Sequence, residues 1–162
     1  MVEPRWHEEV VKKLSQAGWF PSRNVWPQLQ LPPSFKIHSV AKGILSEFGN
    51  LEFGDQFDTT RFDPVAGEEV STEIRKFEII TGRWLYPLGY LQVQDRMYLL
   101  VAEDGIIYRL LGYGRDASLN PAASSFEKVL DYLVRGSDKQ DVMKADLEPL
   151  GLFGKEWRLD EG

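Results

Sequence analysis

Two histidines and one group of glutamates are the residues of this sequence that are best suited to metal binding or acid–base catalysis. His7 and His38 are the only histidines, and neither lies in a His-x-x-x-His or Glu-x-x-His motif. A zinc-type site needs several such ligands at fixed spacing, so we expect no histidine-rich metal site. The chain also lacks cysteine, which excludes disulfides, thiolate metal sites and cysteine nucleophiles. We therefore expect no metal and no cofactor.

Three carboxylates, Glu68, Glu69 and Glu73, lie close together in the sequence. A pair of carboxylates can act as the acid and the base of glycoside hydrolysis. At helical spacing, however, such residues more often form a charged face in contact with water. A hydrolase is therefore the least favoured class, and we predict no catalytic residue and no small-molecule substrate.

Two other motifs are better explained by structure than by catalysis. Gly112-x-Gly114 follows an expected strand, but no helix begins directly after it and no Gly-Lys-Ser/Thr follows, so it does not indicate a phosphate loop. Ser124-Ser125 lacks the flanking residues of a catalytic serine and suits the cap of a helix. Neither motif indicates an enzyme.

The charge of the chain is acidic and unevenly placed. The sequence has 19 Lys and Arg against 25 Asp and Glu, a net charge of −6. Residues 51–80 hold 3 basic and 8 acidic side chains. Nucleic-acid binding needs clustered Lys and Arg to neutralise phosphates, so we expect no direct nucleic-acid partner. The acidic segment suits a basic protein partner, or it simply keeps the protein soluble.

The length of 162 residues indicates one domain with a sizeable core. Its N-terminus shows no basic segment followed by an apolar run, as a signal peptide would require. No apolar stretch is long enough to cross a membrane. We expect a cytoplasmic protein without a membrane partner.

The clearest structural pattern is a hairpin in the second half of the chain. Two apolar, β-prone runs, Met97–Ala102 and Ile106–Leu111, flank Asp104-Gly105. An Asp-Gly pair tolerates the positive φ angles of a tight type I′ turn. Both faces of the hairpin are largely apolar, so we expect it in the middle of a sheet.

A two-residue turn would pair Val101 with Tyr108 and Leu99 with Leu110, whereas a three-residue turn would shift that register. In the two-residue register Arg109 lies on the face that is better suited to water or to a partner. The opposite face has no charge in its strands and is the better core candidate. It consists of Met97, Leu99, Val101, Ile106, Tyr108 and Leu110.

Helical spacing of apolar residues predicts four helices around this hairpin. The first has a buried stripe of Trp6, Val10, Val11 and Leu14, and Ser34 could cap the second. We also expect short strands over residues 51–53 and 56–62, and an edge or irregular strand over 86–93, which contains Pro87 and Gly89. The predicted helices cover residues 4–17, a segment ending at Phe48, residues 68–81 and residues 126–134.

A group of aromatic residues allows two interpretations. These side chains either fill a compact core or form anchors of a protein interface, where Tyr and Trp are enriched. They are Trp84, Tyr86, Tyr90, Tyr98 and Tyr113.

Several segments, in their order and spacing, resemble the SUKH superfamily and especially its third branch. The resemblance runs from about Gly18 to Gly136, and the tail from Ser137 lies outside it. The resembling segments are Ala17-Gly18-Trp19 with Arg23, the helix leading into residues 45–51, Leu85-Tyr86-Pro87-Leu88-Gly89, residues 98–108 and the helix that begins with Ser125-Phe126.

The resemblance implies an α+β fold with a mainly antiparallel central sheet and helices packed against it. It implies one domain over residues 1–136, followed by an extension over 137–162 that is either packed on the domain or partly flexible. It also implies a non-enzymatic, bacterial immunity protein that binds and neutralises a cognate polymorphic or contact-dependent toxin, often a nuclease. The alternative is an intracellular regulatory scaffold without a toxin, as in related eukaryotic proteins.

A nuclease toxin has a basic cleft for phosphates, which would match the acidic segment of this chain. Aromatic groups beside the acidic residues could supply buried anchors. We therefore expect a partner-binding surface formed by Asp55, Asp58, Glu68, Glu69, Glu73, Trp84, Tyr86, Tyr98 and Arg109.

Overall fold

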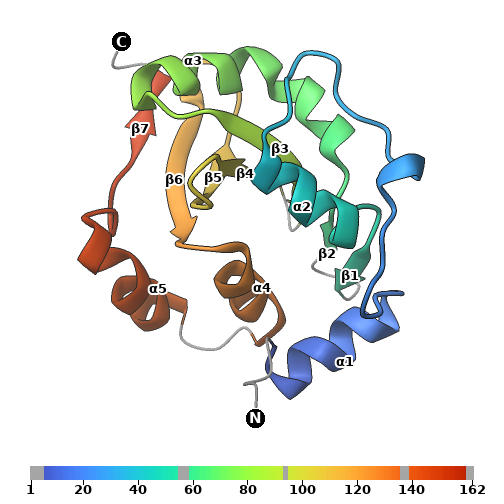
Figure 1. Ribbon diagram of the computed structural model, residues 1–162. Coiled ribbons are helices and arrows are strands. Elements are labelled where there is room, and N and C mark those ends of the chain that lie inside the picture. Colours follow the sequence, from blue (N-terminus) through green and yellow to red (C-terminus); the bar gives the residue numbers. More distant parts are fainter. Residues whose placement is uncertain (1–5, 55–58, 93–94, 136–138, 160–162) are drawn as a thin grey trace.

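The computed structural model describes residues 6–54, 59–92, 95–135 and 139–159 (Figure 1). Its centre is one antiparallel sheet whose strands follow one another in chain order. With helices on both faces of this sheet, the fold is α+β as predicted. The described strands are β1 (Glu52–Gly54), β2 (Thr59–Arg61), β3 (Leu85–Gln92), β4 (Arg96–Ala102), β5 (Ile107–Leu111), β6 (Ser118–Ala123) and β7 (Trp157–Arg158).

The helices divide between the two faces of the sheet (Figure 1). One face packs against α3 (Ser71–Thr81) and the preceding 3₁₀ helix η2 (Pro64–Val70). The other face packs against the remaining α-helices, so the protein has a hydrophobic core on each side of the sheet. These helices are α1 (Glu8–Gln16), α2 (Ser39–Phe48), α4 (Phe126–Arg135) and α5 (Lys139–Leu147); short 3₁₀ helices are η1 (Trp26–Gln28), η3 (Gly114–Asp116) and η4 (Glu148–Leu150).

The predicted hairpin is present and is central, with β4 as the middle strand of the sheet. Its two-residue register is wrong, however, because three residues form the loop. The amide of Ala102 donates to the carbonyl of Ile106 at 3.0 Å, and the amide of Gly105 donates to the carbonyl of Ala102 at 2.9 Å. Gly105 has a φ of +94°, as the last residue of a three-residue loop with a bulge requires.

This shift of one position turns every side chain of β5 to the opposite face. Val101 pairs with Ile107, and Leu99 pairs with Arg109. Arg109 therefore lies on the face covered by α1, α2, α4 and α5, and Tyr108 lies on the face covered by α3. The face that was expected to suit water or a partner is instead largely covered, since both faces of the hairpin carry buried clusters.

Replacing Gly105 by Val should destabilise the protein by about 1–3 kcal/mol, because a β-branched residue resists positive φ. A side chain here would meet nothing within 4 Å, so the cost is one of backbone conformation. Gly105→Asn is the control, since Asn tolerates positive φ and should lose much less. Urea unfolding measures both variants, and equal stability of Val and Asn would contradict this account.

Two predicted helix starts need correction. The second helix begins at Ser39 and not near Ser34, because His38 caps it: the Nδ1 atom of His38 accepts a hydrogen bond from the amide of Ala41 at 3.1 Å. The Nε2 atom of His38 lies 3.0 Å from the carbonyl oxygen of Val101, which ties the helix to β4. His7 likewise precedes α1, and its Nδ1 atom accepts from the amide of Glu9.

The remaining helices and strands agree in part with the predictions made from their sequence patterns. Within α1, Val10 and Leu14 are buried, whereas Val11 is exposed. The helix predicted over 68–81 begins as the 3₁₀ helix η2 and ends at Gly82 as predicted. The irregular strand predicted from Pro87 and Gly89 is present as β3, with a register shift between these two residues, but β3 pairs on both sides and is not an edge. The proposed strand over 56–62 is described from Thr59 onward.

Trp19 and Arg23 form hydrogen bonds with the C-terminal end of α2. Arg23 donates to the carbonyl oxygens of Glu47 at 2.5 Å and Gly49 at 2.9 Å. These carbonyls belong to the last turn of the helix and the residue after it, where a cation is favourable. The indole nitrogen of Trp19 donates to the carboxylate of Glu47 at 2.9 Å.

Buried tyrosines make the stability of this fold sensitive to alkaline pH. Burial raises the pKa of Tyr86 to about 12, above its value of about 10 in an unfolded chain. This stabilising contribution is complete below about pH 9, and it is lost as the pH rises past 10, because the unfolded state ionises first. We expect the unfolding free energy to fall there by about 1.4 kcal/mol per pH unit for each such tyrosine. Unfolding curves at a series of pH values test this, and Tyr86→Phe should give a shallower decline.

Candidate partner-binding surface

The three predicted glutamates lie on the outer side of η2 and α3, and each accepts a hydrogen bond from another segment. The carboxylate of Glu68 accepts from the amide and hydroxyl of Ser34 at 2.7 Å and 2.6 Å. Glu73 accepts from the amide of Gly114 at 3.3 Å. Because all three carboxylates bind donors of the chain itself, their arrangement favours a structural role over an acid–base pair.

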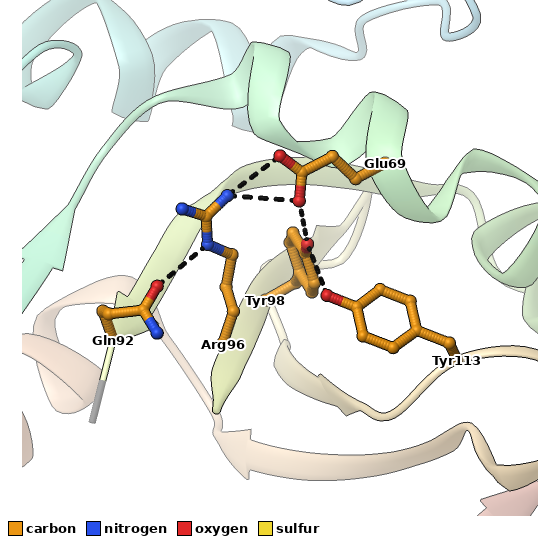
Figure 2. A network of polar contacts seen from close by, with 5 residues as sticks. All are labelled: Glu69, Gln92, Arg96, Tyr98 and Tyr113. Carbon is orange, nitrogen blue, oxygen red and sulfur yellow. Dashed lines mark hydrogen bonds and ion pairs between the residues drawn. The ribbon is translucent and has the colours of Figure 1, made fainter. Parts of the chain in front are cut away.

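Glu69 is the centre of a polar network on this side of the sheet (Figure 2). Its two carboxylate oxygens lie 2.9 Å and 3.1 Å from one nitrogen of Arg96, and the Nε atom of Arg96 donates to Gln92 at 3.1 Å. The hydroxyl of Tyr98 donates to Glu69 and lies 3.4 Å from the hydroxyl of Tyr113. Burial, and next the hydrogen bond to Glu69, raise the pKa of Tyr98 well above its usual value, so Tyr98 remains a donor at neutral pH.

This network lowers the negative charge that the surface presents to a partner. Arg96 offsets the charge of Glu69, and its guanidinium also stacks on the ring of Tyr90 at 3.9 Å. The side chain of Glu69 is still 51% exposed, so it remains accessible. Asp55 and Asp58 lie outside the described residues.

The predicted aromatic anchors differ in exposure. Tyr86 and Tyr98 are buried in the two cores, so their rings do not form part of the surface. Trp84 is 37% exposed, its indole nitrogen donates to the carbonyl of Lys36 at 3.0 Å, and its ring packs edge-on against His38. Tyr113 is also exposed. The anchor interpretation therefore remains open for Trp84 and Tyr113, and the core interpretation holds for Tyr86 and Tyr98.

A cleft of about 370 Å³ lies beside Trp84, between α3 and the loop that precedes α2. Arg75 packs over Phe35, with 5.3 Å between the guanidinium carbon and the ring centre. Burial raises the pKa of Glu78, whose carboxylate accepts from the amide of Leu85. The cleft is lined by Pro33, Ser34, Phe35, Lys36, Arg75, Glu78 and Trp84.

Two exposed isoleucines on α3 were missed by the sequence analysis. Ile79 is 83% exposed and Ile80 is 46% exposed. The buried residues Ile74 and Phe77 already define the inner side of this helix, and two residues beyond Phe77 a side chain points away from it. We call the group Glu68, Glu69, Glu73, Ile79, Ile80 and Trp84, with the adjoining cleft, the α3 surface.

Arg109 does not belong to the α3 surface. It lies across the sheet, opposite Leu99, on the face of α5. Burial lowers the pKa of its guanidinium, and its Nε atom is buried without a hydrogen-bond partner. The structure thus separates Arg109 from the glutamates with which it was grouped.

The part of the chain that the structure describes lacks both a cluster of metal ligands and a membrane-spanning helix. There, no three His, Asp or Glu side chains gather as a metal site would require. No described helix is both long enough and apolar enough to cross a bilayer.

The chain matches a known protein family. The model of the SUKH-3 immunity proteins matches residues 6–136, a range that contains α1 to α4 and the strands from β1 to β6. No curated protein and no solved structure matches the chain. The match covers most of the 162 residues, in the region where the sequence itself resembled this branch of the superfamily. The chain therefore belongs to the SUKH-3 family of immunity proteins.

Proposed function

We propose that this protein neutralises a cognate polymorphic or contact-dependent toxin in the cytoplasm, by binding it stoichiometrically and without catalysis. Its family consists of immunity proteins, which supports a toxin as the partner. The observation that carries the proposal is the α3 surface, where exposed Ile79 and Trp84 lie near a cleft and acidic side chains. Exposed apolar groups with a polar rim are typical of protein interfaces.

Each part of the α3 surface has a role in this proposal. Ile79, Ile80 and Trp84 supply the apolar centre, where most of the binding energy of an interface is found. Glu68, Glu69 and Glu73 supply an acidic rim that suits a basic toxin, such as a nuclease with a phosphate-binding cleft. Asp55 and Asp58, in the same acidic segment of the sequence, remain proposed contributors. Tyr98 acts from the core by holding Glu69, and Tyr86 acts through the core alone.

The hydrogen bonds of the glutamates favour a preformed surface. Glu68 holds the loop that forms one wall of the cleft, and Glu69 holds β4. Surfaces whose side chains are already ordered lose less entropy on binding. A toxin would therefore meet a largely fixed surface of η2 and α3.

Two other functions follow from the same sequence. A regulatory scaffold without a toxin would use the same surface for another partner, and a hydrolase would need free carboxylates at Glu68, Glu69 and Glu73. We keep the division of the chain into a domain over 1–136 and an extension over 137–162 as part of the proposal.

Co-expression tests the proposed function directly. The partner is captured from the source cell with the full-length protein and then expressed alone and together with it. We expect the captured partner to be toxic alone and harmless with one equivalent of this protein. A captured partner without toxicity would favour the scaffold. Retained protection after Glu68, Glu69 and Glu73 are all changed to Gln would remove the hydrolase.

Charge reversal tests the acidic rim. Glu69→Lys with Glu73→Lys should slow association with the toxin about threefold to tenfold at low salt and flatten its salt dependence. Stopped-flow association at several salt concentrations measures this. Glu148→Lys is the matched control, because Glu148 is an exposed acid on η4, away from α3. If the reversed protein keeps the rate and the salt slope of the control, the acidic rim is not part of the interface.

A further inference from the structure

A second cavity lies on the opposite face of the sheet, between β5, β6 and the segment after residue 138. Its volume is about 120 Å³. Its polar lining residues are Arg109, Asn120 and Lys155, and its apolar walls include Met143, Leu147 and Phe153. The walls from Met143 onward lie beyond the residues that the family model matches. We call this cavity the Arg109 pocket.

Arg109 is an unusual residue to find at such a place. The register of β5 points it toward α5, and its Nε atom is buried without a partner. No ion pair or hydrogen bond joins Arg109 to any of the residues described by the structure. Burial is the cause that lowers its pKa, yet an arginine remains charged at neutral pH. Arg109 is half-buried, and a charge that is partly removed from water is costly unless an opposite charge or several acceptors satisfy it.

The lining of the pocket defines which anion would satisfy this charge. Arg109 and Lys155 contribute positive charge, the amide of Asn120 can donate a hydrogen bond, and none of the lining residues that the structure describes is acidic. The volume corresponds to about four water molecules, which is far too small for a nucleotide. The planar guanidinium matches a carboxylate in a two-bond geometry, and the apolar walls suit a short chain of methylene groups.

We propose that the Arg109 pocket binds a carboxylate carried on a short aliphatic stem. Arg109 forms the ion pair, Asn120 donates to the same group, and Lys155 attracts the anion at the rim. Met143, Leu147 and Phe153 enclose the stem. This carboxylate is either that of a free aliphatic acid or that of an acidic side chain on another protein.

Titration of the full-length, ¹⁵N-labelled protein with butyrate tests the proposal. We expect the Nε–H signal of Arg109, assigned by its loss in Arg109→Lys, to shift in a saturable manner with half-saturation near or below about 1 mM. Butyramide, which has the same stem without the charge, should cause no shift. Inorganic phosphate should bind at least about tenfold more weakly, because it lacks the stem. A linear shift, or equal binding of phosphate, would overturn the proposal.

Two variants separate the pocket from general charge effects. Arg109→Met should abolish binding of butyrate and the rise in melting temperature that butyrate causes. Arg109→Lys keeps the positive charge but loses the planar guanidinium that donates two hydrogen bonds, so it should bind butyrate at least about tenfold more weakly. This variant also tests the proposal if Arg109→Met does not fold. Butyrate binding that survives in both variants would overturn the assignment to Arg109.

Two further experiments distinguish a free aliphatic acid from an acidic side chain of a partner protein as the source of the carboxylate. Native mass spectrometry of the freshly purified protein reveals a co-purified small acid, which would identify a free ligand. If capture of the partner is inhibited by saturating butyrate, an acidic side chain of that partner occupies the pocket. These tests do not depend on the proposed toxin function, since butyrate binding is measured on the protein alone.

Discussion

Gly89→Ala is expected to destabilise the protein by about 3 kcal/mol or more, among the largest effects of any single change. An added Cβ at this bulge of β3 would lie 2.8 Å from the Cα of Phe62 and closer still to the carbonyl oxygen of Arg61. The first atom belongs to the residue directly after β2 and the second to the last residue of β2, so neither can move without disturbing the pairing of β2 with β3. Forcing atoms into a packed region costs about 1–3 kcal/mol and occasionally more.

Urea unfolding measures this effect against a matched control. Gly43→Ala makes the same chemical change in α2, where an added Cβ meets nothing within 4 Å. Since Ala favours a helix by about 1 kcal/mol over Gly, that variant should be slightly more stable than the wild type. Similar stability of the two variants would show that β3 does not approach β2 as closely as described.

Ile79→Arg is expected to weaken toxin binding by at least about 2 kcal/mol, or roughly thirtyfold in Kd. Ile79 is 83% exposed, so the change should leave folding intact while placing a bulky positive charge at the centre of the α3 surface. Facing a basic toxin, this charge would add repulsion to the lost apolar contact. Trp84→Ala should have a comparable effect, because aromatic anchors dominate many interfaces.

Calorimetric titration of the captured toxin against each variant measures this loss. Leu150→Arg is the control, since Leu150 is another exposed apolar residue but lies on η4, away from α3. Because Trp84 also packs against His38, its variant is compared with Trp84→Phe, which keeps an aromatic ring. Unchanged affinity in both Ile79→Arg and Trp84→Ala would place the toxin on another face.

The hairpin shows which structural features a local sequence pattern can predict and which it cannot. Asp104-Gly105 between two apolar runs predicted both strands and their central place, because strand pairing and turn chemistry act over a few residues. The pattern left two-residue and three-residue turns open, and the one-residue difference moved Arg109 to the other face. A local sequence pattern cannot decide between these turns when both faces of a strand are apolar.

The helices show the same limit at their ends. Apolar residues at helical spacing predicted a helix over residues 68–81, and α3 ends at Thr81 with Ile74 and Phe77 buried, since such spacing indicates which side of a helix is buried. The start of α2 was predicted too early, because Ser34 is held by Glu68 and the cap is provided by His38. A side chain can cap a helix only if it is not already bound elsewhere. The hydroxyl of Ser34 binds Glu68, which lies 34 residues further along the chain.

By itself, the sequence determined the fold class, the family resemblance, the central hairpin and the lack of any cysteine chemistry. These follow from composition and from patterns that repeat over a few residues. Only the tertiary structure decided that Glu68, Glu69 and Glu73 bind Ser34, Arg96 and Gly114 and that Tyr86 and Tyr98 are buried. It also placed Arg109 across the sheet, with its Nε atom buried and without a hydrogen-bond partner among the described residues. Each of these depends on packing between segments distant in the chain, where burial and hydrogen bonding are set by partners that no local pattern contains.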